Sequence, residues 1–229
     1  MISILPYALA FVFSLLLNVI AIPLLLKLAH KFQWYDSTDS RKIHVGEIPR
    51  IGGIGISIFF FLPALTLPFI FTEPIGLFWS LFIGAVIINM VGILDDFTNL
   101  RPLYKLVGQI AAALVVIFSG NFFSSFYIPF FNITVESVFI GQAVTFIWII
   151  GVTNAINLID GMDGFSSSIT AVISLVMGIA AVFSGNYAQA FILFILFGSI
   201  SGFLIYNFPP AKLFMGDSGS LFIGFVLAC

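Results

Sequence analysis

The chain has 229 residues, of which 61% are hydrophobic and only 8% are charged, with a net charge of −2. Soluble domains carry roughly 25% charged residues, so this composition excludes a soluble globular enzyme and a disordered protein. The charge offers no basic surface for nucleic acid, and the single cysteine, Cys229, excludes internal disulfides and cysteine-based zinc sites. The sequence therefore indicates a polytopic membrane protein.

The predicted spans are charge-free apolar runs, because a helix needs about 20 apolar residues to cross a bilayer. Seven such runs follow one another, at residues 2–26, 51–72, 75–94, 106–123, 138–159, 164–185 and 187–207. An eighth begins near Ser218 and stops at Cys229, which is too short to span. We expect an all-α helical bundle with seven full transmembrane helices and a truncated eighth, forming one transmembrane domain over residues 1–229.

The basic residues give the orientation. With this span count, all of them lie on one side of the membrane: Lys27, Lys31, Arg41, Lys42, Arg50, Arg101, Lys105 and Lys212. Lys and Arg mark cytoplasmic loops, so the N-terminus is expected outside. Only Glu73 and Glu136 are charged on the other side, and every Asp is cytoplasmic too.

Two adjacent carboxylates, Asp95 and Asp96, close the third run in the sequence GILDDFTNLRP. Neighbouring carboxylates repel each other, and charges near hydrocarbon are costly, so a divalent cation or a cationic partner would stabilise them. The alternative is a solvated helix end, although acids are disfavoured there by the helix dipole.

Polar residues recur at three-residue intervals where the fifth run ends, at Asn154, Asn157, Asp160 and Asp163. In a helix this spacing keeps them near one face, and glycines at 161 and 164 permit a tight turn beyond it. A hydrogen-bonded seam between helices is the alternative. Two acids beside two glycines favour a functional site.

Two further loops complete the cytoplasmic side. Phe214, Met215 and Gly216 lead into Asp217, which opens the eighth run either as a plain N-cap or as a carboxylate placed at the membrane surface. The first loop offers His44 and Arg50 among other bases, suited either to phosphate or to lipid headgroups. Acids for a metal and bases for phosphate together suit phosphoryl transfer, and there is no GxxxxGK[ST] motif of an ATP motor.

Four blocks carry a family resemblance: RKIHVGEIPRIGG, GILDDFTNLRP with the following Lys105 and Gln109, NAINLIDGMDG, and NFPPAKLFMGDSGS. In order and membrane side they resemble the polyprenyl-phosphate N-acetylhexosamine-1-phosphate transferases, glycosyltransferase family 4. The resemblance implies an integral-membrane enzyme of the inner (plasma) membrane with its active site on the cytoplasmic face. Such enzymes transfer a sugar 1-phosphate from a UDP-N-acetyl sugar to undecaprenyl (polyprenyl) phosphate and release UMP. The reaction begins cell-envelope polymers such as O-antigen or teichoic acid.

The resemblance also implies residue roles. Asp95 and Asp96 match the acidic pair, one of which is the candidate base toward the lipid phosphate. Asp217 matches the ligand of Mg²⁺, with Mn²⁺ as an alternative and Asn157 as a helper. The resemblance implies substrate-binding roles as well. Asn207 and Phe214 match positions near the uracil, and Asp160 and Asp163 match acids in the nucleotide pocket. Lys105 is implied at the lipid phosphate, and His44 and Arg50 are implied at the sugar or phosphate.

Departures from the family pattern leave alternatives open. Asn99 stands where the DDxxD pattern has a carboxylate, and the late His- and Arg-bearing loop with its further helices is expected to be missing. An inactive lipid-binding remnant and the lipid I-forming phospho-MurNAc-pentapeptide transferase are therefore the rival interpretations. An ion pathway would place acids near helix centres, and no run has one there. Homodimers occur in related enzymes.

Overall fold

The computed structural model describes residues 4–34, 48–71, 75–130 and 132–229, with backbone alone at 75–77. Its helices are α1 (Leu5–Phe32), α2 (Gly52–Ala64), α3 (Leu67–Ile70), α4 (Ile75–Thr98), α5 (Pro102–Phe118), α6 (Val138–Ile159), α7 (Phe165–Phe183), α8 (Tyr187–Asn207) and α9 (Gly216–Ala228). Two short antiparallel strands, β1 (Phe126–Ile128) and β2 (Ile133–Val135), form a hairpin before α6. The fold is thus helical, with one small departure from the predicted all-α class.

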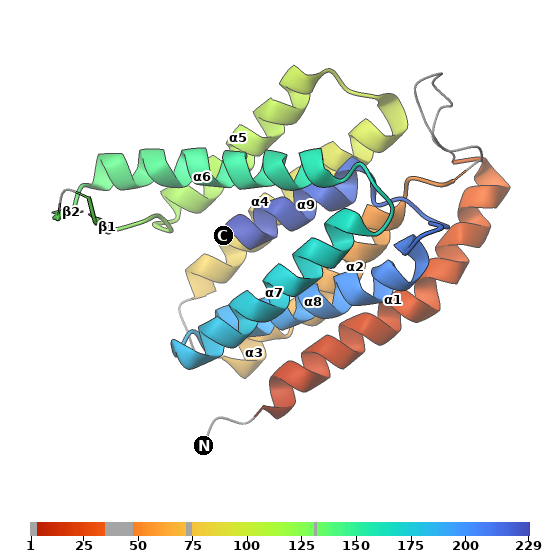
Figure 1. Cartoon of the computed structure of the whole chain (residues 1–229), viewed down its shortest axis with the longest axis horizontal. Coiled ribbons are helices and arrows are strands. Elements are labelled where there is room, and N and C mark those ends of the chain that lie inside the picture. Colours follow the sequence, from red (N-terminus) through yellow and green to blue (C-terminus); the bar gives the residue numbers. More distant parts are fainter. Residues whose placement is uncertain (1–3, 35–47, 72–74, 131) are drawn as a thin grey trace.

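The helices form a bundle with two halves (Figure 1). In one half α8 packs between α1 and α7; in the other α9 packs between α4 and α6, with α5 against α4, and α2 contacts both α8 and α9. The last of these helices in the chain is also the most enclosed, because every α9 residue except Asp217 and Ala228 is buried. The helices around α9 therefore determine which side chains meet at its first turn.

Six segments of the described chain are long and apolar enough to cross a membrane, with α2 and α3 counted together as Gly52–Ile70, against the seven full spans expected. The difference is α5, which begins at Pro102 and has 17 residues rather than filling the predicted run 106–123. Its end coincides with Ser119 and with Gly120 at φ +90°, a conformation that stops the helix. At 1.5 Å per residue α5 is about 26 Å long, slightly less than the hydrocarbon core.

Other bounds agree more closely. The fifth and seventh predicted runs coincide with α6 and α8. The second run is divided into α2 and α3 around Leu65 and Thr66, between two prolines. The third run extends to Thr98, which places Asp95 and Asp96 inside the last turn of α4 rather than beyond it.

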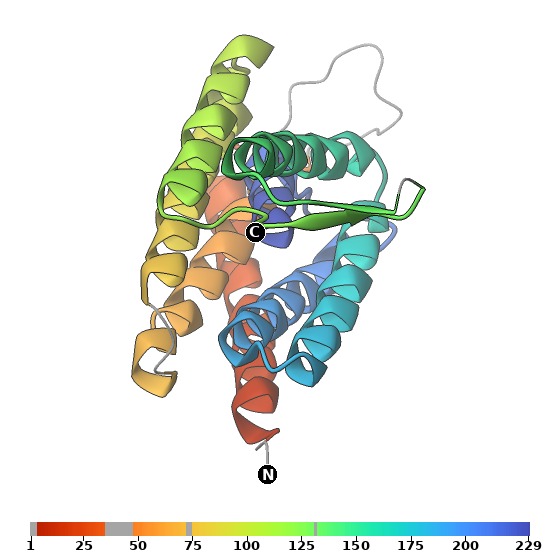
Figure 2. The same cartoon turned by 90° about the vertical axis from the view of Figure 1, so that its left-hand side faces the viewer.

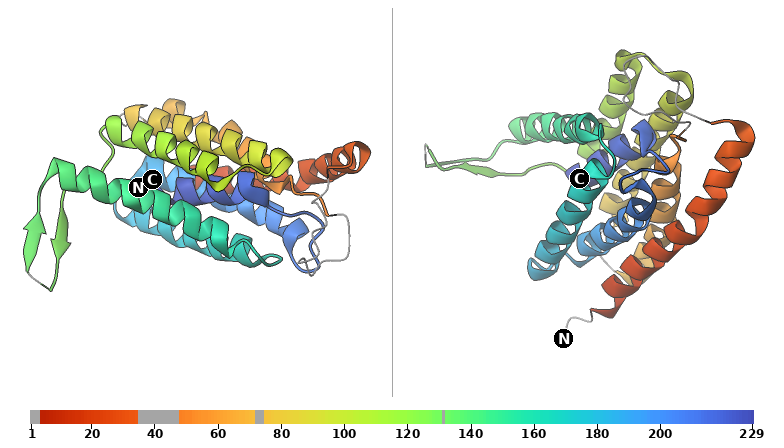
Figure 3. Two further views of the ribbon diagram at one scale, coloured as in Figure 1. Left: turned by 90° about the horizontal axis from the view of Figure 1, so that it is seen from above. Right: turned by 45° about the vertical axis from the view of Figure 1, so that its right-hand side comes forward.

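The bundle has two distinct ends (Figure 2). The N-terminus lies at one end, and α5 begins at the other, where α1 and α4 finish. Seen from above, α6 runs out past the bundle and carries the hairpin at its far end (Figure 3). Asp95 and Asp96, Lys105, the end of α6 and the beginning of α9 consequently share the end that is opposite the N-terminus.

Candidate active site

Backbone hydrogen bonds join the segment before α2 to the loop before α9. The Gly52 and Gly53 amides donate to the carbonyls of Phe214 (3.0 Å) and Met215 (2.8 Å), and the Phe214 amide donates to Pro49 (2.9 Å). A side chain at position 53 would collide with the backbone of Gly219, so the sequence needs glycine there. This contact brings Arg50 and Asp217 to the same place from opposite ends of the chain.

Asp96 holds the first turn of α9. Its two carboxylate oxygens accept the Asp217 amide (2.7 Å) and the Ser218 amide (3.0 Å). Helix N-termini carry unpaired amides and a partial positive charge, so a carboxylate there is stabilising. Gly216 has φ +72°, and a Cβ on it would lie 2.7 Å from the Asp96 carboxylate. Asp96, predicted as one of the catalytic pair, is therefore bound to the backbone that presents Asp217.

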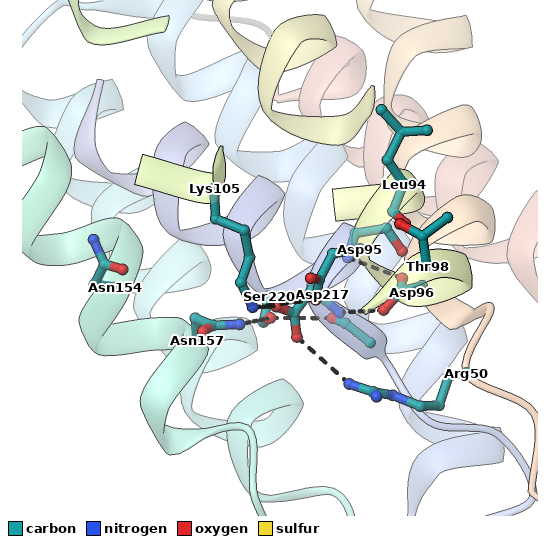
Figure 4. A network of polar contacts seen from close by, with 12 residues as sticks. Arg50, Leu94, Asp95, Asp96, Thr98, Lys105, Asn154, Asn157, Asp217 and Ser220 are labelled. Atoms are coloured by element: carbon teal, nitrogen blue, oxygen red, sulfur yellow. Dashed lines mark hydrogen bonds and ion pairs between the residues drawn. The ribbon is translucent and has the colours of Figure 1, made fainter. Parts of the chain in front are cut away.

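A charged centre lies beside this cap (Figure 4). The Lys105 ammonium is 2.7 Å from Asp217 Oδ2 and 3.1 Å from Asp95 Oδ2. The Arg50 guanidinium makes a longer contact of 3.5 Å with Asp217 Oδ1. Asp95 is only 6% exposed, and its other oxygen, Oδ1, has no hydrogen-bond partner among the described residues. The structure thus brings together Asp95, Lys105, Asp217 and Arg50, as the sequence predicted.

Asn157 reaches the same centre from α6. Its side-chain nitrogen donates to Ser220 Oγ (2.8 Å), and the Ser220 hydroxyl donates to the Gly216 carbonyl (3.0 Å). One turn earlier on α6, Asn154 exchanges hydrogen bonds with Gln109 of α5. Ser220 was not identified from the sequence, although serine one turn after Asp217 lies on the same helix face and could have been found by that spacing.

Asp160 lies just beyond the end of α6, at the edge of the centre. Burial, together with the nearby carboxylates of Asp217 and Asp96, raises the pKa of its carboxyl from 3.8 to about 7, while Arg50 opposes the shift. In the described chain no hydrogen bond to this carboxylate offsets its burial. In the metal-free protein the raised pKa thus favours the protonated form of Asp160.

Asp163 and Asn207 hold the loops together. Asp163 accepts the Ala211 amide (3.0 Å). The Asn207 side chain is buried; it accepts from the Gly164 amide and the Ser167 hydroxyl and donates to the Leu213 carbonyl. These contacts join the turn after α6 to the loop after α8, which also carries Phe214. The nucleotide-binding roles of the three residues stay predictions, and His44 lies outside the described residues.

A divalent cation fits the charges of this site. Four carboxylates, from Asp95, Asp96, Asp160 and Asp217, face two cationic side chains. The described chain holds no group of three His, Cys, Asp or Glu side chains close enough to enclose a metal by itself. Mg²⁺ seldom needs one, because it binds through one or two carboxylates together with substrate phosphates and water. The Asp217 carboxylate at the first turn of α9 is the group suited to it.

Comparison with known sequences identifies the family. The sequence model of glycosyl transferase family 4 matches residues 78–229, which include α4, α6 and α9 with all of their site residues. The chain belongs to glycosyl transferase family 4. The matched region begins in α4 and contains the acidic pair, Lys105, Asn157 and Asp217, whereas Arg50 of the charged centre lies outside it.

Three relatives show the activities after which similar proteins are named. A probable undecaprenyl-phosphate N-acetylglucosaminyl 1-phosphate transferase of Bacillus subtilis (strain 168) is 35% identical over 96% of this chain and 60% of its own length. A phospho-N-acetylmuramoyl-pentapeptide-transferase of Listeria welshimeri is 30% identical over 95% and 71%. A decaprenyl-phosphate N-acetylglucosaminephosphotransferase of Mycobacterium leprae is 33% identical over 88% and 54%. The chain thus spans a little more than half to about seven-tenths of these relatives.

Proposed function

We propose that this chain forms the catalytic core of a polyprenyl-phosphate sugar-1-phosphate transferase. The observation that carries the proposal is the Lys105 ammonium held between the carboxylates of Asp95 and Asp217 at the end of the bundle opposite the N-terminus. Phosphoryl transfer requires the protein mainly to position two phosphates and to balance their charge. A cation flanked by carboxylates, with Arg50 nearby, supplies such a balance.

The proposed reaction joins two phosphates. An oxygen of the lipid phosphate attacks the β-phosphorus of a UDP-N-acetyl sugar, the bond from that phosphorus to the bridging oxygen breaks, and UMP leaves. Lys105 and Arg50 hold the phosphate oxygens. Asp95 accepts the proton of the lipid phosphate, because its Oδ1 has no partner in the described chain, whereas both oxygens of Asp96 are bound by α9. Of the acidic pair, Asp95 is therefore our candidate base.

We propose Mg²⁺ as the cofactor, with Mn²⁺ as an alternative. Asp217 would ligate it, with the Asn157 side chain alongside and the diphosphate of the substrate providing further oxygens. The ion supplies neutralisation of the charge that develops on the phosphates. Asp160 would then lie beside a dication, which favours its ionised form.

The chain reversal between α4 and α6 supports the proposed orientation. Asp95 and Asp160 lie at the same end of the bundle, the first in the last turn of α4 and the second just after α6. Because α4 and α6 both run toward that end, the chain must cross back between them, and α5 makes this crossing. As a short seventh crossing, α5 keeps every Lys and Arg on the side of the site. The positive-inside rule then makes this side cytoplasmic, in the plasma (inner) membrane, with the N-terminus outside.

The donor sugar decides between the family's named activities. We propose a UDP-N-acetylhexosamine, because the Bacillus and Mycobacterium relatives are named for N-acetylglucosamine. The Listeria relative is named for the N-acetylmuramoyl-pentapeptide, which is the second candidate. Homodimer formation is an additional expectation from related enzymes.

The test is UMP release by the purified chain in detergent. The reactions contain UDP-N-acetylglucosamine or UDP-N-acetylmuramoyl-pentapeptide, each with and without undecaprenyl phosphate and Mg²⁺. UMP release that needs the lipid, the metal and UDP-N-acetylglucosamine supports the proposal. UMP release with UDP-N-acetylmuramoyl-pentapeptide alone would instead assign the lipid I-forming reaction to this chain. If neither donor releases UMP while a chain extended to the relatives' length does, these helices need further residues for turnover.

A further inference from the structure

A reciprocal amide pair joins α5 to α6 one helical turn away from the charged centre. Asn154 Nδ2 donates to Gln109 Oε1 at 2.6 Å, and Gln109 Nε2 donates back to Asn154 Oδ1 at 3.2 Å. Gln109 is 3% exposed. Asn and Gln are among the side chains that form hydrogen bonds between packed helices in membranes. Because both bonds need the two amides face to face, the pair depends on the spacing and on the rotation of the helices.

The spacing along each helix links this pair to the site. Lys105 precedes Gln109 by four residues, so the two side chains lie on the same face of α5. Asn157 follows Asn154 by three residues and lies on the same face of α6. The amide pair is thus about one helical turn away from Lys105 and Asn157 on the same two helices, and Figure 4 shows Asn154 near Asn157 on α6.

Both helices are fixed on their other sides. Gly108 of α5 packs directly against the Val91 side chain of α4, where a Cβ would not fit. On α6, Asn157 bonds to Ser220 of α9, and Gly224 of α9 lies against the Thr153 backbone. The amide pair therefore closes a ring of contacts that runs through α4, α5, α6 and α9, and Lys105 must project into the centre of that ring.

We propose that Gln109 and Asn154 are positioning residues that set the rotation of α5, and thereby hold the Lys105 ammonium between Asp95 and Asp217. The pair itself touches neither reacting group in the mechanism above. Its consequence for turnover rests on the proposed function, whereas its consequence for the placement of Lys105 does not.

The first test measures Lys105 without requiring activity. Reductive methylation of the purified chain in detergent, followed by peptide mass spectrometry, gives the rate at which each lysine is modified. Gln109→Ala should speed the modification of Lys105 several-fold, because the ammonium loses its fixed place between the carboxylates. Lys27 of α1 is exposed and takes no part in the site contacts described above, so its rate serves as the internal reference. An unchanged ratio of the two rates would overturn the proposal.

A matched control removes a similar bond elsewhere. Asn121, shortly after α5, donates to Ser80 of α4 at 2.9 Å, near the other end of the bundle. Ser80→Ala should leave the Lys105 rate as in the parent chain. If Ser80→Ala accelerates Lys105 as much as Gln109→Ala does, general loosening explains the result and the positioning role is rejected.

The second test exchanges the two amides and measures UMP release. Gln109→Asn shortens one side chain and Asn154→Gln lengthens the other, so each alone misplaces the pair and the double variant restores its combined length. We expect each single variant to lower kcat by about 10- to 100-fold with little change in the KM for the nucleotide, as a small misplacement of a reacting group does. The double variant should recover most of the loss.

The outcomes separate the two proposals. A double variant no better than the product of the single effects would refute the positioning pair. If neither the parent chain nor a chain extended to the relatives' length shows turnover with any donor, the proposed function fails, and the methylation rates alone then decide whether the pair places Lys105.

Discussion

The strongest prediction concerns Asp96, which the structure makes an anchor of α9. In Asp96→Asn one oxygen still accepts a backbone amide, but the new NH₂ group faces the second amide, and the charge at the helix N-terminus disappears. The charge itself adds little to the balance, because taking an ionised carboxylate out of water costs about as much as the helix dipole and the charge-assisted bonds return. The remaining cost is the backbone amide that loses its acceptor, about 1–3 kcal/mol in the free energy of unfolding, or roughly 2–12 °C in Tm for a chain of this size.

Thermal unfolding in detergent and UMP release, measured on the same preparations, test this reasoning. Asp95→Asn is the matched control, since it removes the same charge one residue earlier without touching the α9 backbone. We expect Asp95→Asn to abolish most turnover with a much smaller fall in Tm. The reasoning is refuted if Asp96→Asn unfolds at the parent temperature and only turnover is lost, because Asp96 would then act in the chemistry. Equal falls in Tm for both variants would point to lost charge rather than lost anchoring.

Three further predictions follow from the same site. Asp217→Asn should fold but lose Mg²⁺-dependent UMP release, and full turnover would contradict its role as metal ligand. The raised pKa of Asp160 means that the fold favours its protonated form, so the free energy of unfolding falls as the pH rises from 3.8 to about 7. Asp160→Asn should therefore raise Tm at pH 8 in metal-free detergent buffer and change Tm little at pH 4. Gly53→Ala should unfold the α2–α9 contact and abolish turnover, whereas Gly151→Ala, which has open space for its Cβ, should leave both Tm and UMP release intact.

The helix bounds show what an apolar run can predict. In α6 and α8 the helix ends where the apolar run ends, and the predicted bounds of these two helices were confirmed. Where charges lie inside a helix, the run stops too early. Helix α4 continues through Asp95 and Asp96, and α1 continues past Lys27. The missing full span has a different cause, because α5 ends at Phe118, before Ser119 and Gly120, whereas the predicted run continues to residue 123.

The site was predictable in membership but not in geometry. Charge sign, spacing and a shared membrane side are enough to predict that Asp95, Lys105 and Asp217 lie together. Which member of the acidic pair faces the ammonium depends on the rotation of α4, since neighbouring residues point about 100° apart on a helix. The capping role of Asp96 also depends on the left-handed conformation at Gly216. Neither is encoded in the run of residues around position 95.

The place of α9 has a consequence for biogenesis. This helix is the last of the described segments to leave the ribosome, yet it fills the middle of one half of the bundle. Until it arrives, the Asp96 carboxylate and the Asn157 amide lack the α9 partners that they bind in the finished bundle. The arrival of α9 supplies these partners and also brings Asp217 to Lys105. The charged centre can therefore assemble only when the last described helix has entered the bundle.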